Sequence, residues 1–209
     1  MWTDIIMVLL ILTNMVVLGT SRLRACIRVV AVQGVALGIL PLLHSFEWQL
    51  LIFAVLSIIL KGIVFPVMLS RTLRQLNVWQ EESPYVGYGL SLLMGPFALA
   101  FSSWISLRLP LPYTIHSTML IPVALFTLIV GLFIIVSRKK ALTQVLGYLV
   151  MENGIYAFGM AIAYHQPMLI ELGVLLDVFV GVFVMGIAIF HISRQFDHIN
   201  TDQLSALRN

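Results

Sequence analysis

Seven long apolar segments limit what this chain can fold into. A membrane-spanning helix needs about 20 mostly apolar residues, and in the bilayer core every backbone polar group must be paired within the protein. Segments of this kind occupy roughly residues 3–20, 26–43, 48–70, 88–107, 117–136, 141–164 and 168–192. Of the 209 residues, 60% are hydrophobic and only 10% are charged. The sequence therefore predicts an all-α, polytopic membrane protein with about seven transmembrane helices in a single domain over residues 1–209.

The basic residues predict how these helices are oriented. Short cytoplasmic loops carry an excess of Lys and Arg. If seven helices alternate across the membrane, Arg108 falls on one side and ten basic residues on the other, namely Arg22, Arg24, Arg28, Arg71, Arg74, Arg138, Lys139, Lys140, Arg194 and Arg208. We therefore expect the N-terminus outside and the C-terminus in the cytoplasm. Basic residues confined to short loops give no reason to expect a nucleic-acid partner.

The cysteine content bears on cofactors. Iron–sulfur clusters are held by several cysteine thiolates, and this chain has one cysteine, Cys26. We expect no cofactor, metal or catalytic active site in this chain, and any redox centres to lie on partner subunits.

Three charges remain near the middle of the membrane once the loop charges are set aside. They are Lys61, Glu152 and Asp177. Each costs roughly 2.5–3.5 kcal/mol at the centre of a transmembrane helix, and such residues usually line ion pathways or helix interfaces. We interpret them as candidate proton-translocation residues.

Helical spacing predicts what surrounds these charges. Residues four apart lie on one helix face, so a polar stripe of Gln144, Tyr148 and Tyr156 accompanies Glu152. These side chains are expected to support the site and to face protein or water. By this argument the asparagine beside Glu152 is less informative than the tyrosines one turn away.

The segment around Lys61 has its own polar and backbone signals. Ser57 lies one turn before Lys61 and is expected to support it. Pro66 cannot donate a hydrogen bond to the carbonyl of Gly62, which predicts a kinked or loosened helix just past the lysine. In other segments, Asn14 and Gln33 are candidates for interhelical hydrogen bonds and carry no more specific signal.

Counting along the last two predicted helices places two acids at similar depth. Glu152 lies about 14 residues before the turn near Gln166 and Asp177 about 10 after it, so their depths differ by about 5 Å. Two neighbouring buried acids should not both ionise easily, which suits a proton path. His165 and Glu171 are candidate ends of that path. Solvation near the membrane surface is the favoured explanation for both, and a role in proton entry or exit is the minority one.

Four stretches of the sequence resemble one known family. They are "ILKGIVFPVML" (59–69), "VLGYLVMENG" (145–154), "ELGVLLDVFVGVFVM" (171–185) and the tail "NTDQLSALR" (200–208). Their order and spacing are similar to those of hydrogenase-4 component E, a membrane subunit of formate hydrogenlyase-type and related group 4 nickel–iron hydrogenase complexes. The chain would then divide into a five-helix part, 1–140, and a helical hairpin with a cytoplasmic tail, 141–209. This second part resembles the K-type subunit of complex I and the C subunit of multisubunit cation/proton antiporters.

The resemblance implies a role without a reaction of its own. In the K-type subunit two helices carry buried glutamates on the proton path. Asp177 matches the second of these in local context, and Glu152 lies about one turn from the first. The implied partners are antiporter-like membrane subunits, a membrane-anchor subunit and peripheral hydrogenase subunits that hold the iron–sulfur clusters and the nickel–iron centre. The implied location is the inner (plasma) membrane of a prokaryote.

Three hypotheses follow, and the sequence leaves them open. The first is a subunit whose buried charges move protons or sodium ions during electron transfer. The second is a scaffold whose charges only pair with neighbouring subunits. The third, which we expect least, is a stand-alone channel or transporter, and identifying the proteins that co-purify in mild detergent would test it.

Overall fold

The structure is a computed structural model that describes residues 2–43, 48–75, 80–81, 84–109 and 117–162. Its α-helices are α1 (Trp2–Gly19), α2 (Leu23–Ile39), α3 (Trp48–Ile59), α4 (Phe65–Gln75), α5 (Tyr88–Ser106), α6 (Leu120–Ser137) and α7 (Ala141–Ile162). A 3₁₀-helix, η1 (Leu40–Leu43), follows α2, and a π-helix, η2 (Leu60–Val64), joins α3 to α4.

Six stretches of the described chain are long and apolar enough to cross a membrane. They are Trp2–Gly19, Leu23–Leu42, Ala54–Arg74, Tyr88–Ser106, Leu120–Ser137 and Ala141–Ile162. Each overlaps one of the first six predicted segments, which confirms the all-α, multi-pass class. The seventh predicted segment, 168–192, lies outside the described residues, and the orientation of the termini stays a prediction.

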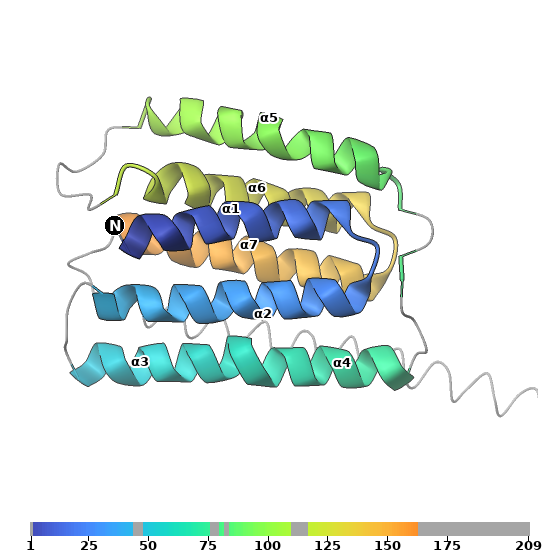
Figure 1. Cartoon of the computed structure of the whole chain (residues 1–209), viewed down its shortest axis with the longest axis horizontal. Coiled ribbons are helices and arrows are strands. Elements are labelled where there is room, and N and C mark those ends of the chain that lie inside the picture. Colours follow the sequence, from blue (N-terminus) through green and yellow to red (C-terminus); the bar gives the residue numbers. More distant parts are fainter. Residues whose placement is uncertain (1, 44–47, 76–79, 82–83, 110–116, 163–209) are drawn as a thin grey trace, which may run out of the picture.

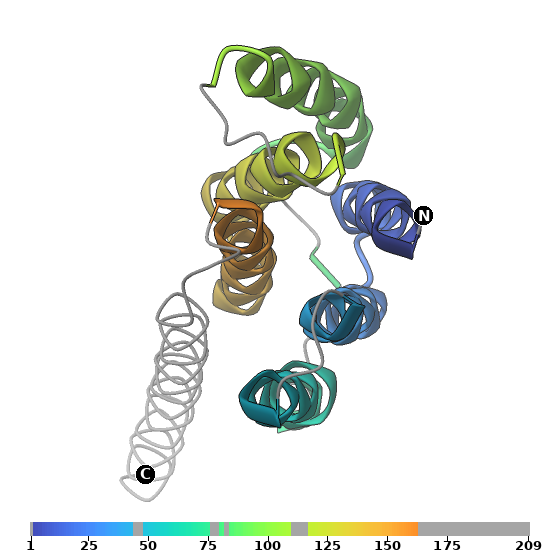
Figure 2. The ribbon, with the colours of Figure 1, turned by 90° about the vertical axis from the view of Figure 1, so that its left-hand side faces the viewer.

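The helices lie side by side with their axes roughly aligned (Figure 1). Seen from one end, α5, α6 and α7 form one row, and α1, α2 and the α3–α4 rod form a second (Figure 2). Helix α1 contacts α5 and α6, and α2 contacts α7 as well as the α3–α4 rod. Both α7 and the π-helix therefore pack against α2.

Glycines let α6 and α7 pack backbone against backbone. A Cβ atom on Gly154 would lie 2.5 Å from the amide nitrogen of Leu128, and one on Gly147 would lie 3.0 Å from the carbonyl oxygen of Gly131. A Cβ atom on Gly131 would in turn overlap the backbone of Met151. Small residues at such contacts are typical of membrane helices, which associate through close packing. The contact fixes the rotation of α7 and hence the direction in which Glu152 projects.

The predicted loosening of the helix near Pro66 is confirmed, and it takes the form of the π-helix. In η2 the amide of Phe65 donates to the carbonyl oxygen of Leu60, five residues back. Pro66 has no N–H group to donate a backbone hydrogen bond. The wider π-helical turn before it accommodates this missing bond while the helix continues. Helices α3 and α4 continue along one line (Figure 1). Lys61 therefore projects from a π-helical turn, a feature frequent at functional sites.

Arg138, predicted to lie in a loop, is the most buried arginine of the described part of the chain. Its side chain is only 1% exposed. The guanidinium donates to the carbonyl oxygens of Leu18 and Val86, both at 3.2 Å, and to the hydroxyl of Ser91 at 3.4 Å. It also lies over the ring of Tyr88. The Leu18 carbonyl lies in the last turn of α1, where carbonyl groups have no partner within the helix. Arg138 thus ties α1 to the start of α5 and the end of α6.

Glu81 binds free backbone amides at the start of α7, as Arg138 binds backbone carbonyl groups. Its carboxylate accepts hydrogen bonds from the backbone amides of Lys139 and Lys140 and from the hydroxyl of Thr143. A carboxylate at a helix N-terminus satisfies free amides and complements the helix dipole. Glu81 is buried, and nothing in the sequence pattern indicated this role.

We predict that Gly131→Ala destabilises the α6–α7 contact by about 1–3 kcal/mol, the usual cost of overpacking a filled interior. The measurement is the thermal midpoint of the detergent-purified protein. Gly159→Ala is the matched control, because no described atom lies within 4 Å of a Cβ atom there. Equal midpoints for the two variants would contradict the proposed close contact.

Candidate functional site: a buried lysine–glutamate pair

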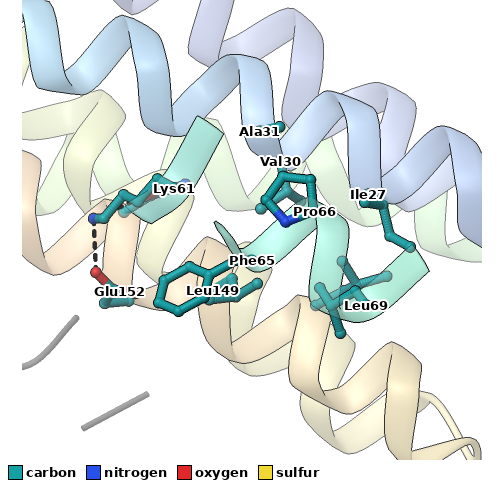
Figure 3. Close-up of a pocket in the computed structure, with 11 residues that line it drawn as sticks. Ile27, Val30, Ala31, Lys61, Phe65, Pro66, Leu69, Leu149 and Glu152 are labelled. Carbon is teal, nitrogen blue, oxygen red and sulfur yellow. Dashed lines mark hydrogen bonds and ion pairs between the residues drawn. The ribbon is translucent and has the colours of Figure 1, made fainter. Parts of the chain in front are cut away.

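A buried ion pair joins the π-helix to α7. The Nζ atom of Lys61 lies 2.6 Å from Oε1 of Glu152, and the two side chains are 5% and 2% exposed. Figure 3 shows the pair at one end of a cavity between these elements. Lys61 lies in the apolar stretch Ala54–Arg74 and Glu152 halfway along α7. Each charge thus offsets part of the other's cost of burial in a medium that solvates neither.

The bundle makes room for Lys61 at a glycine. A Cβ atom on Gly34 of α2 would overlap the Cβ atom of Lys61 and lie 3.2 Å from its Cδ. The missing side chain lets the lysine stem pass against α2 before its ammonium reaches α7. There the Nζ atom also lies 5.0 Å from the ring centroid of Tyr156. A cation over an aromatic ring face is attracted to it, so α7 holds the ammonium from two positions one turn apart.

A second set of polar contacts leads away from the pair. Lys61 Nζ donates to Oδ1 of Asn153 at 3.3 Å, and Asn153 Nδ2 donates to Oε1 of Gln33 at 3.5 Å. Gln33 Nε2 donates to Oδ1 of Asn14 at 2.9 Å, and Asn14 Nδ2 donates to Oγ1 of Thr127 at 2.9 Å. We call these four residues, Asn153, Gln33, Asn14 and Thr127, the amide network. It crosses from α7 through α2 and α1 to α6, and all four side chains are buried.

The cavity beside the pair has mixed walls. It has a volume of about 10 Å³, close to what one water molecule requires. Lys61, Glu152 and Asn153 supply its polar lining, and apolar residues such as Phe65 and Leu149 line the rest (Figure 3). Among the described residues, the Oε2 atom of Glu152 is buried without a hydrogen-bond partner. A carboxylate oxygen in that state can accept a proton or a hydrogen bond from water.

The described residues offer no obvious metal site. No group of three or more His, Cys, Asp and Glu side chains lies close enough there to hold an ion. Cys26 is buried as a free thiol.

Comparison with known proteins shows the family. An uncharacterized protein of Mycobacterium tuberculosis is 30% identical over 96% of this chain and 93% of its own length. Hydrogenase-4 component E of Escherichia coli K12 is 26% identical over 96% of this chain and 94% of its own length, and the Shigella flexneri protein of that name matches equally. This chain belongs to the hydrogenase-4 component E family.

Part of this hydrogenase-4 component E family member is also similar to a subunit of complex I. Residues 119–209 match the family model described as NADH-ubiquinone/plastoquinone oxidoreductase chain 4L. That region includes α6, α7 and Glu152. No solved structure matches the chain. Family membership and the apolar helices make this chain a multi-pass membrane subunit of a respiratory-type complex.

The structure brings some of the predicted site residues of this family member together. Lys61, Glu152 and Tyr156 are in direct contact. Ser57, one turn before Lys61, is buried, and its hydroxyl has no hydrogen-bond partner among the described residues. The predicted partner acid Asp177 lies outside the described residues.

The other predicted supporting residues lie elsewhere. Gln144 donates to the carbonyl oxygen of Arg138 at 3.0 Å, near the start of α7 and two turns from Glu152. Tyr148 is partly buried and packs against the apolar core between the helices. His165 and Glu171, the candidate ends of the path, lie outside the described residues.

Sequence reasoning undervalued the amide network. Asn14 and Gln33, which the sequence offered only as candidates for interhelical hydrogen bonds, do hydrogen bond to each other. Asn153, judged less informative than the tyrosines, is the residue that connects Lys61 to that pair. The available signal was the occurrence of an uncharged amide in each of three apolar segments, in a medium where unpaired polar groups are costly. Spacing along one helix could not show that these amides face one another.

We predict that Lys61→Met destabilises the protein by about 3–5 kcal/mol, because it leaves the Glu152 carboxylate buried without its counter-charge. The double variant Lys61→Met with Glu152→Leu should regain most of that loss, since it removes both charges. The measurement is the free energy of unfolding in detergent. A double variant less stable than the single one would show that the two charges do not compensate each other.

Proposed function

We propose that this chain is the membrane subunit of a group 4 nickel–iron hydrogenase complex of the formate hydrogenlyase type, in the inner (plasma) membrane of a prokaryote. Its relatives named hydrogenase-4 component E support this assignment. In the proposal it links antiporter-like subunits to the membrane anchor. The iron–sulfur clusters and the nickel–iron centre belong to peripheral partner subunits.

We further propose that the buried pair is a station for protons, or for sodium ions, moved during electron transfer. The observation that carries this proposal is the Lys61–Glu152 contact, placed inside apolar helices and beside a cavity with room for one water. Burying a charge pair at this depth has a high free-energy cost, and ionisable residues inside membranes usually mark ion paths. The π-helical turn under Lys61 supports the same interpretation.

The geometry supplies a way for one proton to alter the site. With Glu152 ionised, Oε1 binds the ammonium of Lys61. A proton arriving through water would form an O–H bond at a carboxylate oxygen, and the attraction between the two side chains would fall from that of an ion pair to that of a hydrogen bond between an ammonium and a neutral carboxyl group. Lys61 would keep its contacts with Asn153 and the Tyr156 ring. Releasing that proton to the next station would restore the pair.

Asp177 is the proposed next station. The depth count from the sequence puts it within about 5 Å of the level of Glu152, and the resemblance to the K-type subunit assigns it to the same path. His165 and Glu171 are proposed at the outer end. The change in charge at the pair when Glu152 gains or loses a proton would then couple ion movement in this subunit to its antiporter-like neighbours.

The scaffold alternative has a distinct structural expectation. Charges that only hold neighbouring subunits should face outward and find their partners on other chains. Lys61 and Glu152 instead pair with each other within one chain and are almost fully buried. This favours the ion-moving role over the scaffold.

We predict that Glu152→Gln and Asp177→Asn leave the complex assembled but reduce the ions translocated per hydrogen molecule formed or consumed. Glutamine keeps an oxygen that can accept a hydrogen bond from Lys61 and removes the site of protonation. The complex is purified in mild detergent through a tag on this chain, reconstituted into liposomes, and assayed for hydrogen turnover and ion movement together.

Several outcomes would contradict the proposed function. Elution of the tagged chain without hydrogenase subunits would contradict the assignment to the complex. Variants that assemble and translocate ions normally would remove the buried acids from the path. A low yield of variant complexes with unchanged coupling in those that form would favour the scaffold.

A further inference from the structure

The amide network has one direction along its whole length. Starting at Lys61, every link uses the nitrogen of one side chain as donor and the oxygen of the next as acceptor. An amide has one oxygen and one NH₂ group, so turning any member around would face donor to donor or acceptor to acceptor. The direction is therefore a property of the network as a whole, and a fixed donor or acceptor at any one point decides it.

The end at α6 is fixed by a backbone group. The hydroxyl of Thr127 donates to the carbonyl oxygen of Val123 at 2.8 Å. Its single proton is used there, so Oγ1 can only accept from Asn14. Asn14 must then present its NH₂ group to Thr127 and its oxygen to Gln33.

A second threonine fixes the middle of the network independently. The hydroxyl of Thr13 donates to the carbonyl oxygen of Leu9 at 2.7 Å, and Oγ1 accepts from Nε2 of Gln33 at 2.9 Å. Gln33 therefore turns its NH₂ group toward α1, where it meets both Thr13 and Asn14. Its oxygen is left for Asn153. Two anchors on different helices thus impose the same direction.

The consequence appears at the other end. With its NH₂ group bound to Gln33, Asn153 can offer only an oxygen to Lys61. Hydrogen bonds aligned in one direction polarise one another, and a carbonyl oxygen facing an ammonium makes a charge-assisted bond. Tyr156 adds its ring face to the same cation. Asn153 and Tyr156 thus both stabilise the positive charge on Lys61, and they do so whether or not Glu152 is ionised.

We propose that the amide network is a positioning device that holds Lys61 as a fixed ammonium, so that Glu152 is the member of the pair that gains and loses the proton. This inference rests on the proposed function for its biological meaning, and it assigns the two charges different parts. Lys61 stays bound to Asn153 when the carboxyl is neutral. The same held charge draws the proton off again when the next station is free.

A purely structural role of the amide network predicts a different result from a positioning role. If the hydrogen bonds of the amide network only hold the helices together, their loss would lower the stability of the protein and change nothing else. A positioning role also requires that removing Gln33 or Asn14 alters the behaviour of Lys61, although neither hydrogen bonds to it.

The test uses Gln33→Leu and Asn14→Leu in the purified, reconstituted complex. We expect ions translocated per hydrogen molecule to fall about twofold or more, as for other residues that couple sites indirectly. In a Lys61→Met background the same substitutions should cause no further loss, because their target is gone. Thr72→Val is the matched control, since that buried hydroxyl donates to the Met68 carbonyl of its own helix, outside the network.

A second measurement is independent of ion movement. Nitrogen-15 NMR of lysine-labelled protein in lipid, with the Lys61 signal identified by its loss in Lys61→Met, reports whether this nitrogen is an ordered ammonium. We expect one narrow ammonium signal in the wild type and in Thr72→Val, and a broadened or displaced one in Gln33→Leu. If Gln33→Leu does not assemble, Thr127→Val is compared with Thr127→Ser, which keeps the hydroxyl and should behave as wild type.

The outcomes separate this inference from the proposed function. An unchanged lysine signal in every network variant overturns the inference, whatever the complex translocates. A wild-type complex that moves no ions overturns the proposed function, and the lysine signal then decides the positioning role alone. Equal loss of coupling in Gln33→Leu with and without Lys61 would also overturn the inference.

Discussion

The arrangement of this membrane domain depends on one contact, the buried ion pair between Lys61 and Glu152. Neither charge could remain inside apolar helices at this depth without a partner close enough to offset its desolvation. That requirement fixes the distance between the α3–α4 rod and α7. It also explains the glycine at position 34, where any larger residue would displace the lysine stem.

Other features of the bundle position the two ends of this contact. Glycine packing against α6 sets the rotation of α7 and aims Glu152 and Asn153 toward α2 and the π-helix. The π-helical turn lets Lys61 leave its rod just before Pro66. Arg138 and Glu81 close one end of the bundle by binding backbone groups in the last turn of α1 and in the segments just before α5 and α7. The site is thus built from contacts among most of the described helices.

The sequence predicted what depends on composition and local spacing. Apolar length located all six described spans, and the cost of burial singled out Lys61 and Glu152. The loosened backbone near Pro66 followed from a missing N–H group. Tyr156 followed from its position one turn beyond Glu152, and the structure places it against Lys61.

What the sequence could not predict depends on how helices rotate against one another. The row of residues four apart also contained Gln144, which lies two turns away and binds a backbone carbonyl instead. Asn153 is not in that row, yet it touches Lys61 because α7 presents the face between positions 152 and 156 to the π-helix. Arg138 looked like a loop charge, and its burial arises from carbonyl groups on helices distant in sequence.

The central claim is that Glu152 changes protonation while the complex works. Infrared difference spectroscopy of the intact complex, recorded as hydrogen is supplied, tests it most directly. The account predicts a carbonyl band of a protonated carboxyl that appears during turnover, shifts in deuterated water and disappears in Glu152→Gln. Continued ion translocation with an identical difference spectrum in wild type and Glu152→Gln would contradict it.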